Sequence, residues 1–385
     1  MSPSFLTEAA SPAIHSSTVG MLALWRERAR LAEGRPFDAL HDMLRGTVDI
    51  ISAATFGFEI GATTAQFNLL ASIKKLELPR DTDTEAVFPV AEDPPAYTSI
   101  RTMVDSIEIG MQSPMPRQHF TLALKLYPYL VKAKKHRDVM IREKIEASWA
   151  KFSRNDSNDG LVKSAVDLIV QREAQMARKE GRLPMYNTQA IRDELFGFIQ
   201  AGHETTSTTI CWAIKHLTEH QEIQQKLRSE IRIAHMRAVN SHELPTAQEI
   251  VKANVPYLDA FIEESHRMGT TVPAVVRRAT KDTVILGHHI PKGTDVFMIT
   301  NGPSFQSPAF PIAESMRTKS SQEAKDRYGM WEDSNIQDFV PERWLVKEES
   351  GKTVFNPRAG PVLPYGMGVR GCFGMYRVHY QFPSL

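Results

Sequence analysis

The residues best suited to chemistry lie near the end of the chain, in the stretch YGMGVRGCFG (365–374), which contains four glycines, one arginine and one cysteine. Two kinds of site fit this composition. Gly366, Gly368 and Gly371 match the G-x-G-x-x-G pattern of a phosphate-binding turn. Alternatively, Cys372 binds a metal, because glycines let backbone amides approach a thiolate closely and a coordinated metal deprotonates a thiol.

The surrounding sequence disfavours the nucleotide site. A dinucleotide-binding turn needs a strand before it, a helix after it and an acidic residue about 20 positions later. Only fourteen residues follow Gly371, none of them Asp or Glu, and residues 356–364 contain three prolines. Arg370 places a positive charge two residues before Cys372, which favours the metal site. A glycine-rich surface loop with an incidental cysteine is the remaining alternative.

A second candidate is AGHETTSTT (201–209), in the middle of residues 186–217, whose pattern predicts one long helix. Its glycine, serine and four threonines have low helix propensity. Ser and Thr side chains can bond back to carbonyls one turn earlier and bend a helix, which can open a notch for a ligand. Glu204 and Thr205 would then form an acid and alcohol pair suited to relaying protons. The alternative is a surface kink with a solvated Glu204.

A third pattern is EESHR (263–267), in which Glu264 and Arg267 stand three residues apart on a predicted helix and share one face. Such pairs are usually exposed and contribute little to stability. FVPERW (339–344) supplies Arg343, a second guanidinium that would join the same carboxylate if the fold brings them together.

The elements that must position these residues are mostly helical. Apolar residues recur every three or four positions over residues 5–58, which predicts helices there. The patterns of residues 221–235 and 255–268 predict two more helices. Residues 272–300 have short alternating apolar runs separated by turns, which predict a small antiparallel sheet. Residues 316–337 are predicted to form a long polar loop. We therefore expect a mainly α single domain with small antiparallel sheets.

Composition narrows the function classes. The chain has 385 residues, of which 42% are hydrophobic and 24% charged, as in ordinary globular proteins. A net charge of +1 and the lack of a basic run with aromatics argue against nucleic-acid binding. Two cysteines are too few for a cysteine-built zinc or iron–sulfur site, but a single thiolate ligand is possible. The sequence shows neither a signal peptide nor a run of eighteen apolar residues.

Taken in order, AGHETT, ExxR, PERW and YGMGVRGCFG resemble the motifs of cytochrome P450, the haem-thiolate monooxygenases, and are most similar to the eukaryotic microsomal, fungal-like branch. The resemblance runs from about Phe5 to Gly374. It implies a P450-like helical fold and a haem whose iron is bound by Cys372, in the loop that includes Gly366 and Gly374. Arg370 and Arg277 are implied to contact the haem propionates, with Arg278 as the alternative to Arg277.

The resemblance also assigns the other motifs. Glu204 and Thr205 match the acid and alcohol that deliver protons to iron-bound oxygen, and Glu264, Arg267 and Arg343 match a buried structural triad. Seven residues fall where the family lines its substrate pocket: Phe198, Ala201, Gly202, Val272, Ala274, Val275 and Val276. Cys211 matches nothing in the family and is interpreted as a core residue of the long helix.

This sequence departs from the family pattern in three places. Tyr365 stands where the family usually has Phe. The family's membrane anchor, first strands and early helices have no counterpart before Met1, and the tail after Gly374 differs from the family's long helix and final β region. We therefore expect one P450 domain over residues 1–385 that is incomplete at both ends, with unpaired sheet edges, poor haem retention and poor catalysis.

The implied activity is insertion of one oxygen atom from O2 into a small lipophilic substrate in secondary metabolism, with electrons from NADPH through a reductase partner. The alternatives are a haem-thiolate isomerase or dehydratase and a truncated non-catalytic product. The family resemblance implies association with the endoplasmic reticulum membrane, whereas the chain by itself, without an anchor, reads as cytoplasmic.

Overall fold

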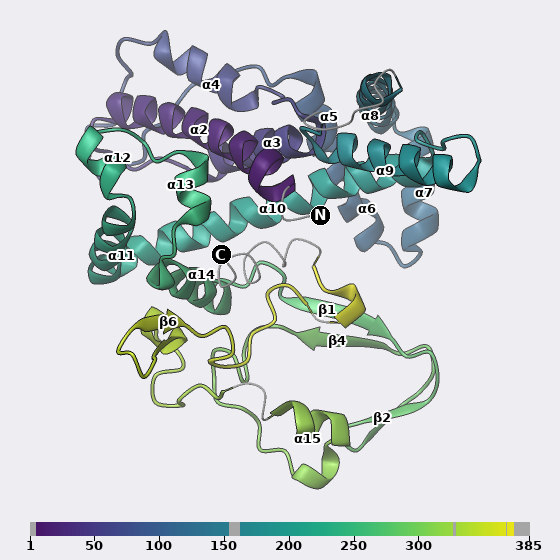
Figure 1. Ribbon diagram of the computed structural model, residues 1–385, viewed down its shortest axis with the longest axis vertical. Coiled ribbons are helices and arrows are strands. Elements are labelled where there is room, and N and C mark those ends of the chain that lie inside the picture. The colour runs from purple at the N-terminus through teal and green to yellow at the C-terminus, as the bar shows by residue number, and fades with distance from the viewer. Residues whose placement is uncertain (1–4, 154–161, 326–328, 367, 373–385) are drawn as a thin grey trace. The chain divides into compact units, whose positions relative to one another are not determined.

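The computed structural model describes the chain except for residues 1–4, 154–161, 326–328, 367 and 373–385. The chain divides into two compact units, Met1–Ser207 and Thr208–Leu385, and the boundary falls within helix α10 (Figure 1). The expectation of a single domain over residues 1–385 stays a prediction.

The regular elements in the described part of unit 1 are all helices. Its elements are the π-helix η1 (Leu6–Ala10), α2 (Ser11–Ala32), α3 (Leu40–Phe56), α4 (Ala62–Ala71), α5 (Pro95–Asp105), α6 (Ile107–Met111), α7 (Pro116–Leu126), α8 (Pro128–Phe152), α9 (Ala165–Glu180) and the first part of α10 (Gln189–Glu219). Helix α2 packs against α3 and α4, and α8 packs against α5 and α9.

In its described residues, unit 2 combines shorter helices with three strand pairs. Its further helices are α11 (Gln221–Ala234), α12 (Met236–Ser241), α13 (Ala247–Lys252), α14 (Pro256–Met268) and α15 (Lys319–Lys325), with 3-10 turns η2 (Glu314–Met316), η3 (Pro341–Trp344) and η4 (Gly368–Arg370). Its strands are β1 (Ala274–Arg278), β2 (Thr283–Ile285), β3 (His288–Ile290), β4 (Asp295–Ile299), β5 (Leu345–Lys347) and β6 (Thr353–Phe355).

Local sequence signals set several helix ends. Thr246 forms a capping box with Glu249 at the start of α13, and Ser164 caps α9 by accepting a hydrogen bond from the Asp167 amide. Gly181 ends α9 in the left-handed conformation, with φ 66°, that glycine adopts most easily. Helix α14 begins with Pro256, whose fixed φ suits a first helical position.

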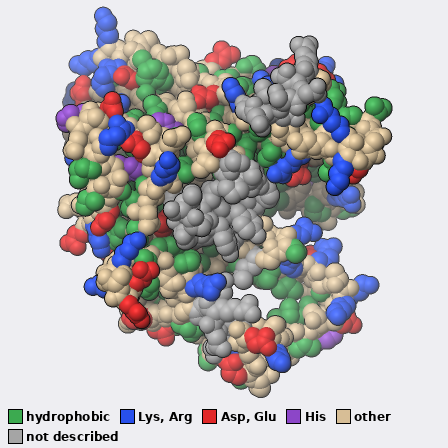
Figure 2. Space-filling view, in the orientation of Figure 1, with side chains coloured by type: hydrophobic (Ala, Val, Ile, Leu, Met, Phe, Trp, Pro, Cys, Tyr) green, Lys and Arg blue, Asp and Glu red, His purple; other side chains and the backbone are tan. Residues whose placement is uncertain are grey.

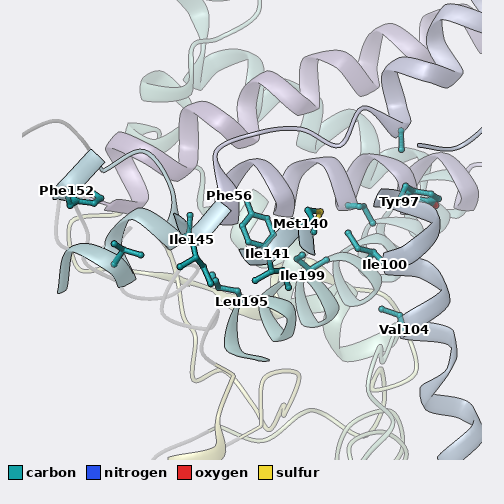
Figure 3. Close-up of a cluster of buried hydrophobic side chains, with 14 residues drawn as sticks. Phe56, Tyr97, Ile100, Val104, Met140, Ile141, Ile145, Phe152, Leu195 and Ile199 are labelled. Atoms are coloured by element: carbon teal, nitrogen blue, oxygen red, sulfur yellow. The ribbon is translucent and has the colours of Figure 1, made fainter. Parts of the chain in front are cut away.

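The core of unit 1 is a cluster of buried side chains from α3, α4, α5, α8, α9 and α10 (Figure 3). Ile100, Ile145, Leu195 and Ile199 in this cluster are all 0% exposed. Burying a side chain of this size stabilises the fold by about 1.5–3 kcal/mol. The first part of α10 therefore packs into the core of unit 1 through the side chains of Leu195 and Ile199.

Helices α10 and α3 approach closely at Gly202. A Cβ atom placed on Gly202 would lie 2.6 Å from Cδ1 of Ile51, whereas a Cβ on Gly197 would meet nothing within 4 Å. Gly202, predicted to line a substrate pocket, thus has a packing role within unit 1: it leaves room for the Ile51 side chain.

We expect Gly202→Val to lower the free energy of unfolding by about 1–3 kcal/mol, because the added side chain overpacks the contact with Ile51. Gly197→Ala is the matched control in the same helix, and it should raise stability by roughly 0.5–1 kcal/mol. Urea unfolding of both variants measures the difference. Equal stability of Gly202→Val and the parent chain would show that α3 and α10 are not closely packed there.

The strands that the structure describes in unit 2 form three separate two-stranded antiparallel sheets, β1 with β4, β2 with β3, and β5 with β6. In the first, Ala274 pairs with Ile299 and Arg278 with Asp295. The expected antiparallel structure over residues 272–300 is therefore present, as two pairs rather than one sheet. The expected polar loop over residues 316–337 contains the helix α15, whose first turn has the Ser321 and Gln322 amides hydrogen-bonded to Thr318.

Charged side chains of both signs are interspersed on the face shown in Figure 2, as expected from a net charge of +1. Among the described residues, none of the helices is both apolar enough and long enough to cross a bilayer.

Candidate functional site

Helix α14 carries a buried ion pair between Glu264 and Arg267, whose side chains are both 0% exposed. Arg267 donates from Nε and Nη2 to the two carboxylate oxygens of Glu264, each at 2.8 Å. Its remaining N–H groups reach the carbonyls of Phe305, Ile336 and Asp338 at 2.5, 2.7 and 2.8 Å. All five guanidinium donors therefore have acceptors, which satisfies the requirement for burying a charge. The burial excludes the alternative of an exposed ion pair.

The Glu264 carboxylate also accepts hydrogen bonds from the segment after α15. Arg343 Nε donates to Glu264 Oε1 at 3.1 Å, the Val340 amide donates to that oxygen at 2.8 Å, and Trp344 Nε1 donates to Oε2 at 2.9 Å. Arg343 also donates to the side chain and the carbonyl of Asn335. The structure thus brings Glu264, Arg267 and Arg343 together, and the network holds residues 335–344 against α14.

The cysteine loop is shaped by tight turns. Gly366 and Gly368 have φ of 65° and 67°, a region that favours glycine. The Gly371 amide donates to the Gly368 carbonyl at 2.9 Å, and the Cys372 amide donates to the Tyr365 carbonyl at 2.7 Å. The side chains of Cys372 and Arg370 are exposed. Gly374, predicted to belong to this site, lies outside the described residues.

Tyr365 ties the cysteine loop to helix α14. Its hydroxyl lies 2.9 Å from Nε2 of His266 and forms a hydrogen bond with it. Burial is the main cause that raises the pKa of the Tyr365 hydroxyl, and the nearby Glu263 and Cys372 raise it further. The hydroxyl therefore stays protonated at neutral pH. The hydroxyl of Tyr365 thus contacts the helix that also carries the buried ion pair.

Strand β1 separates the two arginines predicted as alternatives. Arg278 forms a two-point ion pair with Asp295 across the β1–β4 pair, with both N–O distances 2.7 Å. Arg277, the residue before Arg278, lies on the opposite face of the strand. It is exposed and donates to the carbonyl of Val276. Because Arg278 is already held by a carboxylate, Arg277 is the better candidate to bind a further anionic group.

Helix α10 runs through the threonine-rich stretch without interruption. Thr205 Oγ1 donates to the carbonyl of Ala201 at 2.6 Å, the back-bond that was expected from its position. Ala201, Glu204 and Thr205 are exposed, whereas His203 is buried and its Nδ1 lies 2.9 Å from the Ile199 carbonyl. Glu204 and Thr205 therefore share the exposed side of the helix, away from the core of unit 1.

The seven residues predicted to line a substrate pocket fall in both units. Phe198, Ala201 and Gly202 belong to unit 1, where Phe198 packs against the buried cluster. The other four residues belong to unit 2, on strand β1 and just before it: Val272, Ala274, Val275 and Val276. Val272 and Val276 are 41% and 44% exposed, so this strand offers apolar surface.

The donor set of unit 2 fits a haem in its chemistry. Cys372 offers an exposed thiol on a loop fixed by two left-handed glycines, and thiolate sulfur is one of the ligands of haem iron in proteins. Arg370 and Arg277 are exposed cations of the kind that pair with carboxylates such as haem propionates. Neither arginine is committed to a carboxylate among the described residues.

A family model described as "Cytochrome P450" matches residues 1–315, more than three quarters of the chain. The chain belongs to the cytochrome P450 family. A cytochrome P450 monooxygenase of Pestalotiopsis microspora, GME11363, is 46% identical over 97% of this chain and 65% of its own length. The monooxygenase TRI13 of Fusarium sporotrichioides is 34% identical over 99% of this chain and 68% of its own. The chain thus spans about two thirds of the length of these P450 relatives.

A solved P450 structure has the same fold. The cytochrome P450DA heme domain superposes with a TM-score of 0.61 over 98% of this chain and 66% of that one, at 19% identity. This likeness confirms the predicted mainly helical P450 fold with small antiparallel sheets.

Sequence reasoning missed two groups near these P450 motifs. Trp344 lies next to Arg343 and donates a further hydrogen bond to Glu264. The signal for this contact was its indole N–H, which needs an acceptor when the ring is buried. His266 lies inside the ExxR motif, and the unusual Tyr365 was the signal that a polar partner was needed.

Proposed function

We propose that this P450 chain is part of a haem-thiolate monooxygenase that inserts one atom of O2 into a small lipophilic molecule. The single observation that supports this most is the exposed Cys372 on its glycine-shaped loop, which is linked through Tyr365 and His266 to the buried network of α14. Family membership supplies the reaction class.

Each residue has a role in this proposal. A bound haem with a thiolate ligand would supply the chemistry, because electron donation from sulfur favours O–O cleavage. Cys372 would be that ligand, and Arg370 and Arg277 would pair with the two propionates. Glu264, Arg267 and Arg343 would keep residues 335–344 in place, since they form buried hydrogen bonds with groups of that segment.

Protons would reach the reacting oxygen through the exposed side of α10. The Thr205 hydroxyl donates to the Ala201 carbonyl and its oxygen can also accept, and the neighbouring Glu204 presents a carboxylate to solvent. Their exposure and adjacency support a relay in which Glu204 takes protons from water and Thr205 passes them on.

Replacing Thr205 with alanine should divert reducing equivalents to hydrogen peroxide and lower the product formed per NADPH, because a positioned proton-transfer group typically contributes about 100-fold or more to a rate. Product, NADPH and peroxide are measured together in the haem-loaded protein with a reductase. Thr205→Ser keeps the hydroxyl and should retain most of the coupling.

Thr206→Ala is the matched control, because Thr206 is the next residue and is also exposed. It should leave the ratio of product to NADPH unchanged. Equal coupling in Thr205→Ala and Thr206→Ala would contradict a relay through Thr205.

Electrons would come from NADPH through a reductase, and we propose that the protein acts at the endoplasmic reticulum membrane in secondary metabolism. The support is similarity to fungal P450 monooxygenases, including one whose name places it in the Hps1-dma1 cluster of Dothistroma septosporum. The exposed Val276 of β1 and the exposed Val272 just before it favour a lipophilic substrate over a charged one.

One set of measurements tests the reaction class. The reduced protein should give a thiolate-type carbon monoxide difference spectrum, and turnover under ¹⁸O2 should place one labelled oxygen in the product. Turnover without oxygen consumption would instead identify a haem-thiolate isomerase or dehydratase. A protein with no haem spectrum would contradict the proposal.

A further inference from the structure

A second group of metal-binding side chains lies at the end of α10, where the chain turns into α11 (Figure 1). His216, Glu219 and His220 follow one another in the stretch HLTEH. One potential donor atom from each of these residues lies within 4.8 Å of the others. Two histidines four residues apart are a common pair of zinc ligands, and a glutamate carboxylate is a common third ligand. All three residues belong to unit 2, and none has a role in the proposed haem site.

The buried member of this group is His216, whose side chain is 8% exposed. Its ring stacks on Phe339 at 4.3 Å between centroids and faces Trp212 at 6.0 Å, so its orientation is fixed by packing. Neither ring nitrogen has a hydrogen-bond partner within the part of the chain that the structure describes. A buried polar group without a partner is costly, so a ligand bound to this imidazole would remove that cost.

Glu219 is arranged to accept a cation without losing its present partner. Its Oε1 is held by Lys215 Nζ at 2.5 Å, whereas its Oε2 lies 3.7 Å from Nδ1 of His216. Two ligands that are each about 2.0–2.1 Å from a tetrahedral zinc ion lie roughly 3.3 Å apart. A shift of a few tenths of an ångström would therefore bring Oε2 and Nδ1 onto one ion while Lys215 stays on Oε1.

The protonation states and the helix also favour a cation. Burial lowers the pKa of His216, and the hydrogen bond from Lys215 lowers the pKa of Glu219. At neutral pH this imidazole is neutral and the carboxylate is ionised, the forms in which they bind metals. Helix α10 ends at Glu219, so its negative dipole end adds to the attraction.

We propose that His216, Glu219 and His220 bind one divalent transition-metal ion, with zinc as the best match to two imidazoles and a carboxylate. The fourth position would be filled by water, because the set supplies three ligands. Phe339 would form the apolar wall of the site, since it stacks on both histidines, at 4.3 Å for His216 and 5.3 Å for His220.

The test is calorimetric titration of the haem-loaded, chelator-treated protein with zinc chloride. We expect one ion per chain at this site and a rise in the thermal midpoint when zinc is present. His220→Ala and His216→Phe should each weaken binding at least about tenfold. His216→Phe keeps an aromatic ring against Phe339 and so preserves the packing. If it does not fold, Glu219→Gln on the surface serves as the second variant.

His289→Ala is the matched control, because His289 is an exposed histidine on β3 of the same unit. It should bind zinc as the parent does. Cobalt replaces zinc as a probe of the ligands, and its spectrum should lack a thiolate-to-cobalt charge-transfer band. The proposal is overturned if the parent does not bind zinc, if His216→Phe binds as tightly as the parent, or if the cobalt spectrum shows thiolate ligation.

Discussion

Replacing Cys372 with alanine should abolish the thiolate-type Soret band of the reduced carbon monoxide complex. That band depends on a sulfur ligand to haem iron, and Cys372 is the exposed sulfur that the glycine turns at Gly366 and Gly368 present. The expected loss is complete, because no other residue of this loop within the described residues offers a thiol. The measurement is the difference spectrum of purified, haem-reconstituted protein.

The matched control is Cys211→Ala, since Cys211 is half-buried on helix α10 and has no place in the proposed haem site. This variant should keep the thiolate-type band at parental intensity. A band that survives in Cys372→Ala, or one that disappears only in Cys211→Ala, would show that the iron ligand has been assigned to the wrong cysteine.

Replacing Glu264 with alanine should lower the free energy of unfolding by about 3–5 kcal/mol, which is the usual cost of breaking a buried ion pair. The carboxylate accepts from Arg267, Arg343, Trp344 and the Val340 amide, and its removal leaves two guanidiniums facing each other without a countercharge. Because this network holds residues 335–344 against α14, haem content should also fall. Arg343→Ala should reduce haem content too, while leaving the Glu264–Arg267 pair in place.

An exposed ion pair of the same unit provides the control. Asp295→Ala removes the two-point contact with Arg278 on the β1–β4 pair. The Asp295 side chain is 41% exposed and the Arg278 side chain 70%. An exposed pair contributes about 0–1 kcal/mol, so this variant should stay near parental stability. Urea unfolding compares the two variants. If Glu264→Ala costs no more than Asp295→Ala, the Glu264 network does not stabilise the fold as proposed.

The sequence alone determined the features that depend on local spacing. The three-residue interval between Glu264 and Arg267 places both on one helix face, and a threonine in a helix bonds back to the carbonyl four residues earlier, as Thr205 does. The order of the motifs also identified the P450 family, because each motif is a short run of neighbours along the chain.

Tertiary structure decided the features that depend on contacts between residues far apart in sequence. Spacing could not show that Arg343 and Trp344 reach a carboxylate about 80 positions earlier, because only the packing of η3 on α14 brings them there. That Arg278 pairs with Asp295 was likewise set by the cross-strand position of Asp295. The reason for Gly202 was likewise invisible in sequence, since the side chain that fills its space, Ile51, belongs to another helix. Local rules fix which face of an element a side chain occupies, whereas its partner across that face is set by how the elements pack.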